Sequence, residues 1–227
     1  MEHYGQYCPV SRAAELLGDR WTLLIVRDMV VDGVSHFNDL SRGLPRLSRG
    51  LLARRLRELE HAGILTCPSR QAGRRSEYQL TPAGAALVPI IEALLEWGSA
   101  WAFGEPRAQE LDPVVLMWWM HRRVCHEHLP EQRVVVEFTF EEEPGRGFWL
   151  VLGRRDVSVC LHPPDFETDV WLTTTLRTMY QVWLGRVSYA EAVETGQIQV
   201  RALPALERAL PSWFLWSSAA VAVRRSA

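Results

Sequence analysis

The fold of the first half of this chain is decided by residues 47–63, LSRGLLARRLRELEHAG. Three leucines in it recur at the i, i+4, i+7 spacing of one buried helical face: Leu52, Leu56 and Leu59. Ser48 can cap the first free amides of this helix, and Gly63 suits the left-handed residue that ends it. At about 100° per residue, Arg54 and Arg57 fall on the opposite face. We therefore expect a helix with an apolar back and an arginine-bearing front.

The residues on either side of this helix extend the pattern. Phe37, Leu40 and Leu44 indicate a short helix, which Gly43 and Pro45 end just before Ser48. Two short helices joined by a tight turn, the second rich in arginine, are typical of a helix-turn-helix. Downstream, strand-like runs at 64–67 and 76–80 flank a basic segment that contains glycine. Together they predict a hairpin wing.

Positive charge is concentrated in this region. Between Pro45 and Arg75 there are eight arginines against two acids, although the whole chain has a net charge of −2. Charge placed in this way is typical of phosphate binding, so we expect double-stranded DNA as a partner. The predicted DNA-contacting residues are Arg46, Ser48, Arg49, Arg54, Arg57, Arg74 and Arg75. The alternative is a helix face that is only solvated. Arg55, nearer the buried face, is expected to pair instead with an acid such as Asp28 or Asp39.

Length and composition limit the number of domains and the class of protein. The 227 residues, 48% hydrophobic and 23% charged, suit one large or two ordinary globular domains. No uninterrupted apolar run approaches the roughly 20 residues of a membrane helix, and the N-terminus lacks a basic region followed by an apolar core. We therefore expect a cytoplasmic protein without a membrane partner. The four scattered cysteines, without CxxC spacing, are expected to be reduced.

Helices flank the proposed DNA-binding unit on both sides. Pro9 suits the first turn of one helix, and Asp19 can cap a second over residues 20–29. Thr81 and Pro82 open a long helix that runs to about residue 101. Its apolar coverage exceeds what packing on a small domain requires, which favours a twofold homodimer.

Residues 7–103 resemble the HxlR family of winged helix-turn-helix regulators. The matching segments, taken in order, are CP at 8–9, LGDRWT at 17–22, FNDL at 37–40, LS at 47–48, LARRLRELE at 52–60 and YQLTPAG at 78–84. The resemblance implies a dimeric transcription factor whose dimer is built from the N-terminal helix and the helix at 81–103.

The polar segment at 104–110 predicts a domain junction. After it, helices are expected at 114–126, 176–184, 189–194 and 203–210, and strands at 133–140, 148–152, 157–161, 170–173 and 198–201. The fold class is therefore α+β with two domains. We place the winged helix-turn-helix domain at residues 1–104 and the second domain at residues 112–227.

The second domain resembles the sterol carrier protein type of lipid-binding domain. The segments that carry this resemblance are DVWLTTTL at 169–176, LG at 184–185, EAVETGQIQV at 191–200 and residues 206–214. It implies a curved sheet covered by helices around an apolar cavity for a hydrophobic small molecule. Aromatic residues mostly serve as core, but a subset is expected to line this cavity: Trp118, Phe138, Trp149, Trp171 and Trp183.

Cysteine and histidine side chains could carry other chemistry. Cys8, just before a helix start, lies where free amides favour a thiolate, and the resemblance makes a redox switch an alternative to a buried residue at the dimer seam. His121 and Cys125 share a helical face, but no third metal ligand is evident. No nucleophile elbow, phosphate-binding loop or paired carboxylates are present, so we expect no enzyme activity, cofactor or metal.

These observations favour a homodimeric, sequence-specific transcriptional regulator, acting as a repressor, whose second domain binds a hydrophobic effector. Two alternatives stay open. One is a thiol-based redox sensor that acts through Cys8. The other is a lipid carrier or scavenger that uses its winged half for dimerisation.

Overall fold

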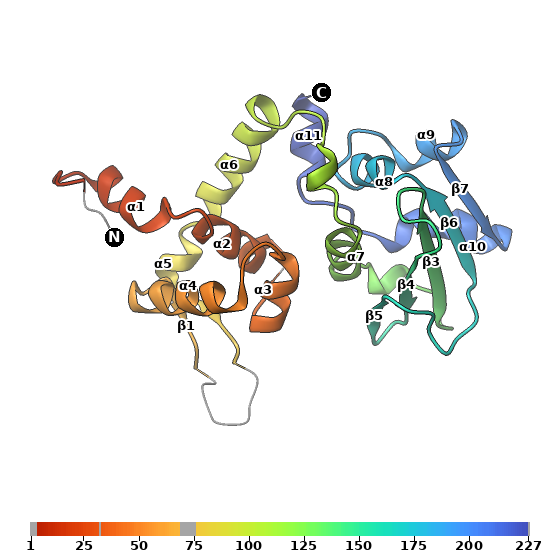
Figure 1. The fold of residues 1–227 in the computed structure, drawn as a ribbon, viewed down its shortest axis with the longest axis horizontal. Helices are drawn as coiled ribbons and strands as arrows, with labels where there is room; N and C mark the ends of the chain where they lie inside the picture. The colour runs from red at the N-terminus through yellow and green to blue at the C-terminus, as the bar shows by residue number, and fades with distance from the viewer. Residues whose placement is uncertain (1–3, 32, 69–75, 227) are drawn as a thin grey trace. The chain divides into compact units, whose positions relative to one another are not determined.

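The computed structural model describes residues 4–31, 33–68 and 76–226. The chain forms two compact units, Met1–Leu94 and Leu95–Ala227 (Figure 1). The division between them falls inside one helix. Each unit is therefore described by itself.

The first unit is helical with one small hairpin. Its helices are α1 (Pro9–Leu17), α2 (Thr22–Val31), α3 (Phe37–Gly43), α4 (Arg49–His61), α5 (Pro82–Ala85) and the start of α6 (Val88–Trp101). Strands β1 (Leu65–Thr66) and β2 (Gln79–Leu80) pair in antiparallel fashion, with Leu65 opposite Leu80. Helices α3 and α4 with this hairpin form the predicted winged helix-turn-helix. The predicted tip of the wing, including Arg74 and Arg75, lies outside the described residues.

Helix α4 begins and ends as its sequence predicts. The hydroxyl of Ser48 accepts a hydrogen bond from the amide of Leu51 at 3.3 Å. Gly63 has φ +72°, and the amide after it, that of Ile64, donates to the carbonyl of Leu59 at 2.9 Å. This left-handed ending satisfies carbonyls that the last helical turn leaves free. The three leucines of the apolar face are buried in the core of the unit: Leu52, Leu56 and Leu59.

Helix α6 keeps much of its apolar surface exposed. The segment Pro82–Trp101 is long and apolar enough, by length and composition alone, to cross a membrane. Glu92 and Glu96 lie within this segment, so its apolar residues do not form an uninterrupted run. Among the exposed side chains are Trp97 at 60% and Trp101 at 78%. This face leaves room for a partner surface.

The second unit is built from a five-stranded sheet and a set of helices. The strands are β3 (Val134–Phe140), β4 (Gly147–Leu152), β5 (Val157–Cys160), β6 (Val170–Thr174) and β7 (Ile198–Ala202). The helices are α7 (Pro113–Arg122), α8 (Leu176–Trp183), α9 (Tyr189–Glu194), α10 (Pro204–Ala209) and α11 (Ala220–Ser226), with short 3-10 turns η1 (Ala108–Glu110), η2 (His126–His128) and η3 (Leu210–Trp213). Helix α11 and the three turns were not predicted.

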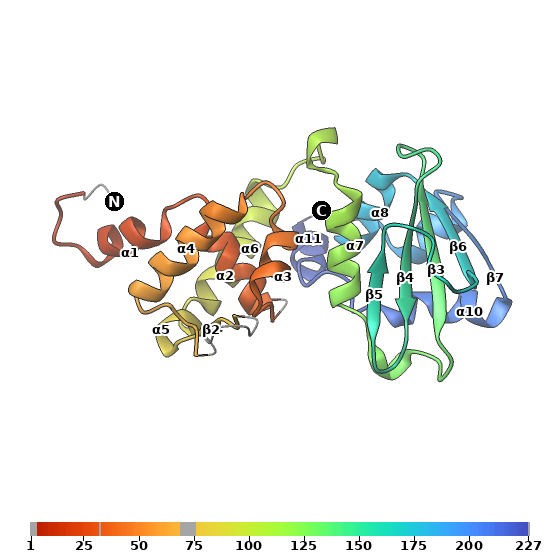
Figure 2. The same cartoon turned by 60° about the horizontal axis from the view of Figure 1, so that its bottom comes forward.

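The sheet has the strand order β5-β4-β3-β6-β7. Strands β3 and β6 run parallel and every other neighbouring pair is antiparallel. The mixed sheet with its helices fits the predicted α+β class (Figure 2). Helices α7, α8 and η3 bury one face of the sheet in the main core. On the opposite face, which we call the outer face, Val135, Trp149 and Val151 form a separate small cluster.

Candidate nucleic-acid interface

Helices α3 and α4 are joined at their N-terminal ends by Arg49. Its guanidinium donates to Oδ1 of Asn38 at 2.8 Å and lies 4.8 Å from the ring centroid of Phe37. The side chain stays exposed on the surface. Arg49 therefore helps to fix the angle between the two helices while keeping its charge outward. The role of Asn38 was not predicted, because nothing in the sequence connects two polar residues eleven positions apart.

Two neighbouring arginines of α4 make ion pairs with acids of the same unit. Arg55 contacts both Asp19, before α2, and Glu58, and its side chain is only 16% exposed. The prediction that Arg55 pairs with an acid is confirmed, but the two acids given as examples are wrong. Asp28 pairs with Arg27, and Asp39 pairs with Arg42. Arg55 is therefore a structural residue that ties α4 to the start of α2.

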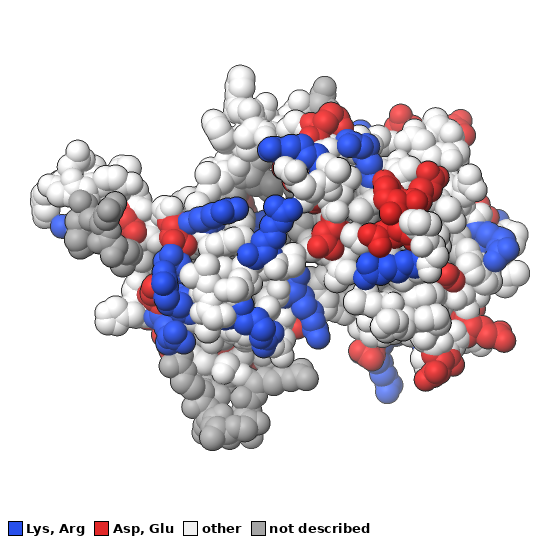
Figure 3. Space-filling model, viewed as in Figure 1, with Lys and Arg blue, Asp and Glu red and all other residues white. Residues whose placement is uncertain are grey.

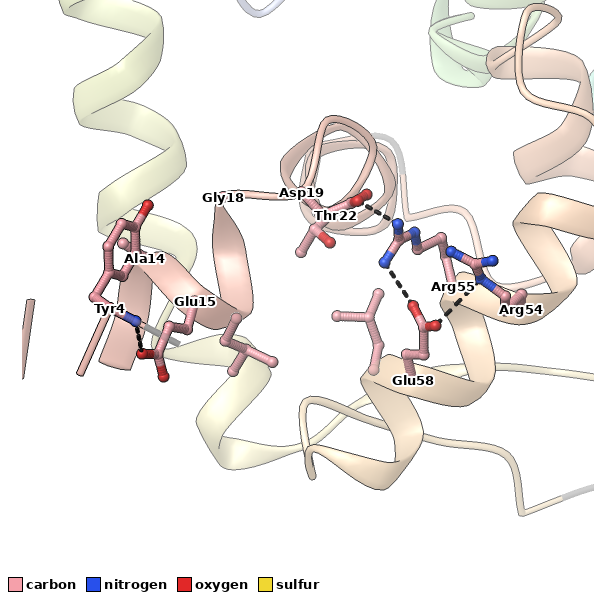
Figure 4. Close-up of a pocket in the computed structure, with 11 residues that line it drawn as sticks. Tyr4, Ala14, Glu15, Gly18, Asp19, Thr22, Arg54, Arg55 and Glu58 are labelled. Atoms are coloured by element: carbon pink, nitrogen blue, oxygen red, sulfur yellow. Dashed lines mark hydrogen bonds and ion pairs between the residues drawn. The ribbon is translucent and has the colours of Figure 1, made fainter. Parts of the chain in front are cut away.

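Arg54, unlike Arg55, makes its ion pair in a solvent-exposed position. Its Nε is 3.3 Å from a carboxylate oxygen of Glu58, and both side chains remain largely in solvent. Figure 4 shows Glu58 between the two arginines on the wall of a pocket of about 590 Å³. An exposed pair of this kind contributes only about 0–1 kcal/mol. A phosphate can therefore replace Glu58 as the partner of Arg54 at little cost.

Three further predicted contact residues lie on the surface of this unit. Arg46, Ser48 and Arg57 are exposed. Within the described part of the chain, no carboxylate pairs with Arg57. Figure 3 shows arginines spread over the face that α3 and α4 present. The surface can therefore offer several guanidinium groups to one phosphate backbone.

Comparison with known proteins identifies the family of this unit. The profile of the HxlR-like helix-turn-helix family matches residues 16–106. An uncharacterised HTH-type transcriptional regulator of Mycobacterium tuberculosis is 37% identical over 148 residues, which are 61% of this chain and 87% of the relative. The chain belongs to the HxlR-like family of helix-turn-helix transcriptional regulators. As an HxlR-like protein it is a transcriptional regulator, and the family implies DNA binding.

Two further proteins are similar to part of this HxlR-like chain. YvaP of Bacillus subtilis, an uncharacterised HTH-type transcriptional regulator, is 35% identical over 100 residues, 42% of this chain and 90% of YvaP. The solved structure of reduced YodB from B. subtilis is 30% identical with a TM-score of 0.37, over 43% of this chain and 96% of that one. The family profile ends at residue 106, so it leaves most of the second unit undescribed.

In the second unit, the structure separates the five residues predicted to line one cavity. Phe138 and Trp183 are buried in the main core between the sheet and the helices. Trp149 belongs to the outer-face cluster, and Trp171, which alternates with the buried Leu172 along β6, shares that face. Trp118, on α7, stacks on His121 with ring centroids 4.9 Å apart. The sequence could not show this division, because it depends on which way each strand faces.

The four cysteines are free thiols. Cys8 is the N-cap residue of α1, with Pro9 in the first turn. The backbone amides of Ser11 and Val10 lie close enough to lower the pKa of this thiol below its ordinary value, although no capping hydrogen bond forms. A lower pKa increases the fraction of reactive thiolate at neutral pH. Among the described residues, no group of three or more His, Cys, Asp or Glu side chains is placed to hold a metal ion.

Proposed function

We propose that this HxlR-like regulator is a homodimeric repressor that reads DNA with α4 and holds it with the hairpin. The observation that carries the proposal is the exposed arginine front of α4, with Arg54 weakly paired and Arg57 unpaired among the described residues. In a twofold dimer, two such helices would enter successive major grooves about 34 Å apart. Arg49, Arg54 and Arg57 would contact bases or phosphates in the major groove, and Arg46 would add a basic group from the turn before α4.

The exposed apolar side chains within the first 103 residues support a homodimer. On α6 the exposed large side chains are Ile90, Leu94, Trp97 and Trp101, and Tyr7 and Val10 are exposed at the start of the chain. Exposed apolar patches of this kind mark interaction surfaces. A second copy of the chain, with the same helix, would cover them by a self-complementary contact.

We further propose that the second unit is a sterol carrier protein-like domain that binds a hydrophobic effector, without cofactor or enzyme activity. The main core contains large aromatic side chains such as Phe138 and Trp183, which would give such a ligand apolar surroundings. Two polar atoms on the helical side, the indole nitrogen of Trp213 and the hydroxyl of Tyr189, are buried without a hydrogen-bond partner in the described structure. Such groups are costly when unpaired, so an apolar ligand with an acceptor oxygen would suit this region.

Within the second unit, the end of α6 is bound to the effector domain by Arg186. Its guanidinium donates to the carbonyls of Phe103 and Gly104 and pairs with Glu105 at 2.9 Å. Arg225 of α11 lies 3.6 Å from Glu96 of α6. A ligand can change DNA affinity only by its differential affinity for two arrangements of the dimer. These contacts give ligand binding a path to the proposed dimer helix.

The proposal is tested by sequencing the DNA that the purified protein selects from a random pool. We expect a palindrome whose half-sites are centred one helical turn apart. Gel shifts with that DNA over candidate hydrophobic ligands, guided by mass spectrometry of co-purified small molecules, then test the effector. Unchanged DNA affinity with a demonstrably filled domain would refute effector control. Absence of any selected sequence would instead favour a lipid carrier.

A second candidate, a thiol-based redox sensor, is favoured by the lowered pKa of Cys8 at the start of α1. Oxidation there would alter the segment that carries Tyr7 and Val10, which we place in the dimer. The test compares diamide-induced DNA release in the parent protein, in Cys8→Ser and in the control Cys67→Ser. Release that persists in Cys8→Ser would dismiss the switch.

A further inference from the structure

The outer face of the sheet carries one lateral row of side chains, with one residue from each strand. The strand register pairs Cys160 with Trp149 and Trp149 with Glu137. It also pairs Glu137 with Trp171 and Trp171 with Arg201. Figure 2 shows the five strands in this order. Glu137 therefore occupies the central strand, with a tryptophan on each neighbouring strand.

The carboxylate of Glu137 is held close to the ring of Trp149. A Cβ atom on Gly147 would lie 2.6 Å from two atoms of the Trp149 ring and 3.1 Å from Oε1 of Glu137. The ring and the carboxylate thus meet above a position where any other residue would collide with them. Neighbouring strands are about 4.8 Å apart, and the register places Trp171 beside Glu137 on the strand opposite to that of Trp149.

The row lacks a positive partner at its centre. Within the described residues, no arginine or histidine lies within ion-pair distance of Glu137, whose hydrogen bond comes from the hydroxyl of Thr168 at 3.5 Å. The guanidinium of Arg201 lies 4.3 Å from the ring centroid of Trp171, so this indole already binds one cation. Indole faces and a carboxylate all attract positive charge, and a half-buried carboxylate without a counter-charge is unfavourable.

We propose that this row is a binding site for an organic cation, with Glu137 as the counter-ion and Trp149 and Trp171 as aromatic walls. The ligand class is an alkylguanidinium or alkylammonium group. Trp149, 7% exposed, supplies the buried wall, and the half-buried Trp171 supplies the open one. The site lies on the face of the sheet opposite the core in which a hydrophobic effector is proposed, so it does not depend on that effector.

The test is calorimetric titration of the full chain with butylguanidinium, tetramethylammonium and neutral butylurea. Both cations should bind and butylurea should not. Glu137→Gln, which keeps the shape but removes the charge, should weaken cation binding about tenfold or more. The control Glu131→Gln, an exposed acid outside the sheet, should bind as the parent does. Trp171→Leu should also weaken binding while Glu137 remains.

Indole N–H resonances give a second readout, and unfolding midpoints check that each variant is folded. Titration of the parent should shift the signals of Trp149 and Trp171. The affinity for a capped Gly-Arg-Gly peptide is compared with that for butylguanidinium. This comparison distinguishes an arginine side chain of another protein from a free small molecule as the source of the bound cation. The proposal is overturned by equal cation affinity in the parent and Glu137→Gln, by butylurea binding as well as the cations do, or by no binding of any cation at millimolar concentration.

Discussion

The guanidinium of Arg55 forms an ion pair with the carboxylate of Asp19, which joins the middle of α4 to the start of α2. Arg57, two residues further along the same helix, faces solvent without a carboxylate partner among the described residues. The two arginines have the same chemistry and opposite surroundings. Arg55 is expected to stabilise the fold, and Arg57 is expected to bind DNA.

Replacing Arg55 by alanine should therefore destabilise the first unit. The change leaves Asp19 without its partner, which typically costs about 1–3 kcal/mol. Urea unfolding measures this loss. Arg57→Ala is the matched control and should stay within about 0.5 kcal/mol of the parent. Equal losses in both variants would show that the ion pair contributes nothing particular.

Arg57→Ala, which should hardly change stability, should weaken DNA binding. Arg57→Ala should weaken binding to the selected duplex by about 1–3 kcal/mol if the side chain reads a base, with relaxed preference at one position. If it contacts only phosphate, binding to all sequences should weaken equally and the salt slope should fall by about 1. Fluorescence anisotropy distinguishes these cases. Arg208→Ala, on α10 of the second unit, should leave DNA affinity unchanged.

Dimerisation should depend on the exposed apolar face of α6. Trp97→Ser removes a large side chain from this face, so sedimentation equilibrium should show a shift from dimer to monomer. Leu203 is also apolar and 70% exposed, but it lies before α10. Leu203→Ser should leave the dimer intact. A parent protein that is monomeric at micromolar concentration would contradict the proposed assembly.

Stability of the second unit should fall at alkaline pH. Burial raises the pKa of Tyr180 to about 12, and its hydroxyl donates to the carbonyl of Asp112 at 3.0 Å. Because the folded pKa lies above the ordinary value of about 10, the fold favours the protonated phenol. This contribution is complete below pH 10 and is lost as the pH rises toward 12. Thermal unfolding across this range should show a shallower decline for Tyr180→Phe than for the parent.

The sequence predicted the first unit well because its signals are local. The cap at Ser48, the leucine spacing of α4 and Gly63 all act within one helix and its ends. In the second unit, the strands and helices were located to within a few residues, again from local periodicity. Helix α11 was missed, because its short run of small apolar residues resembles a tail.

Side-chain partners and shared sites were much harder to predict. The partners of Arg55 depend on how α2 and α4 pack, which the spacing of residues in α4 does not contain. Of the residues predicted to line one cavity, Phe138 and Trp183 lie in the core on one side of the sheet, and Trp149 and Trp171 lie on the outer face. Alternation along a strand does not say which face is covered by helices. For the same reason, the row centred on Glu137 was not foreseen.

The central claim is that the arginine front of α4 binds duplex DNA. The most direct test is the affinity for the selected duplex, measured by anisotropy as salt rises, beside a scrambled duplex of equal length. With six or more phosphates contacted, the logarithm of the binding constant should fall linearly with the logarithm of salt, with a slope of about −5 or steeper, and the selected duplex should bind far more tightly. Equal affinity for both duplexes, or binding that does not change with salt, would contradict the claim.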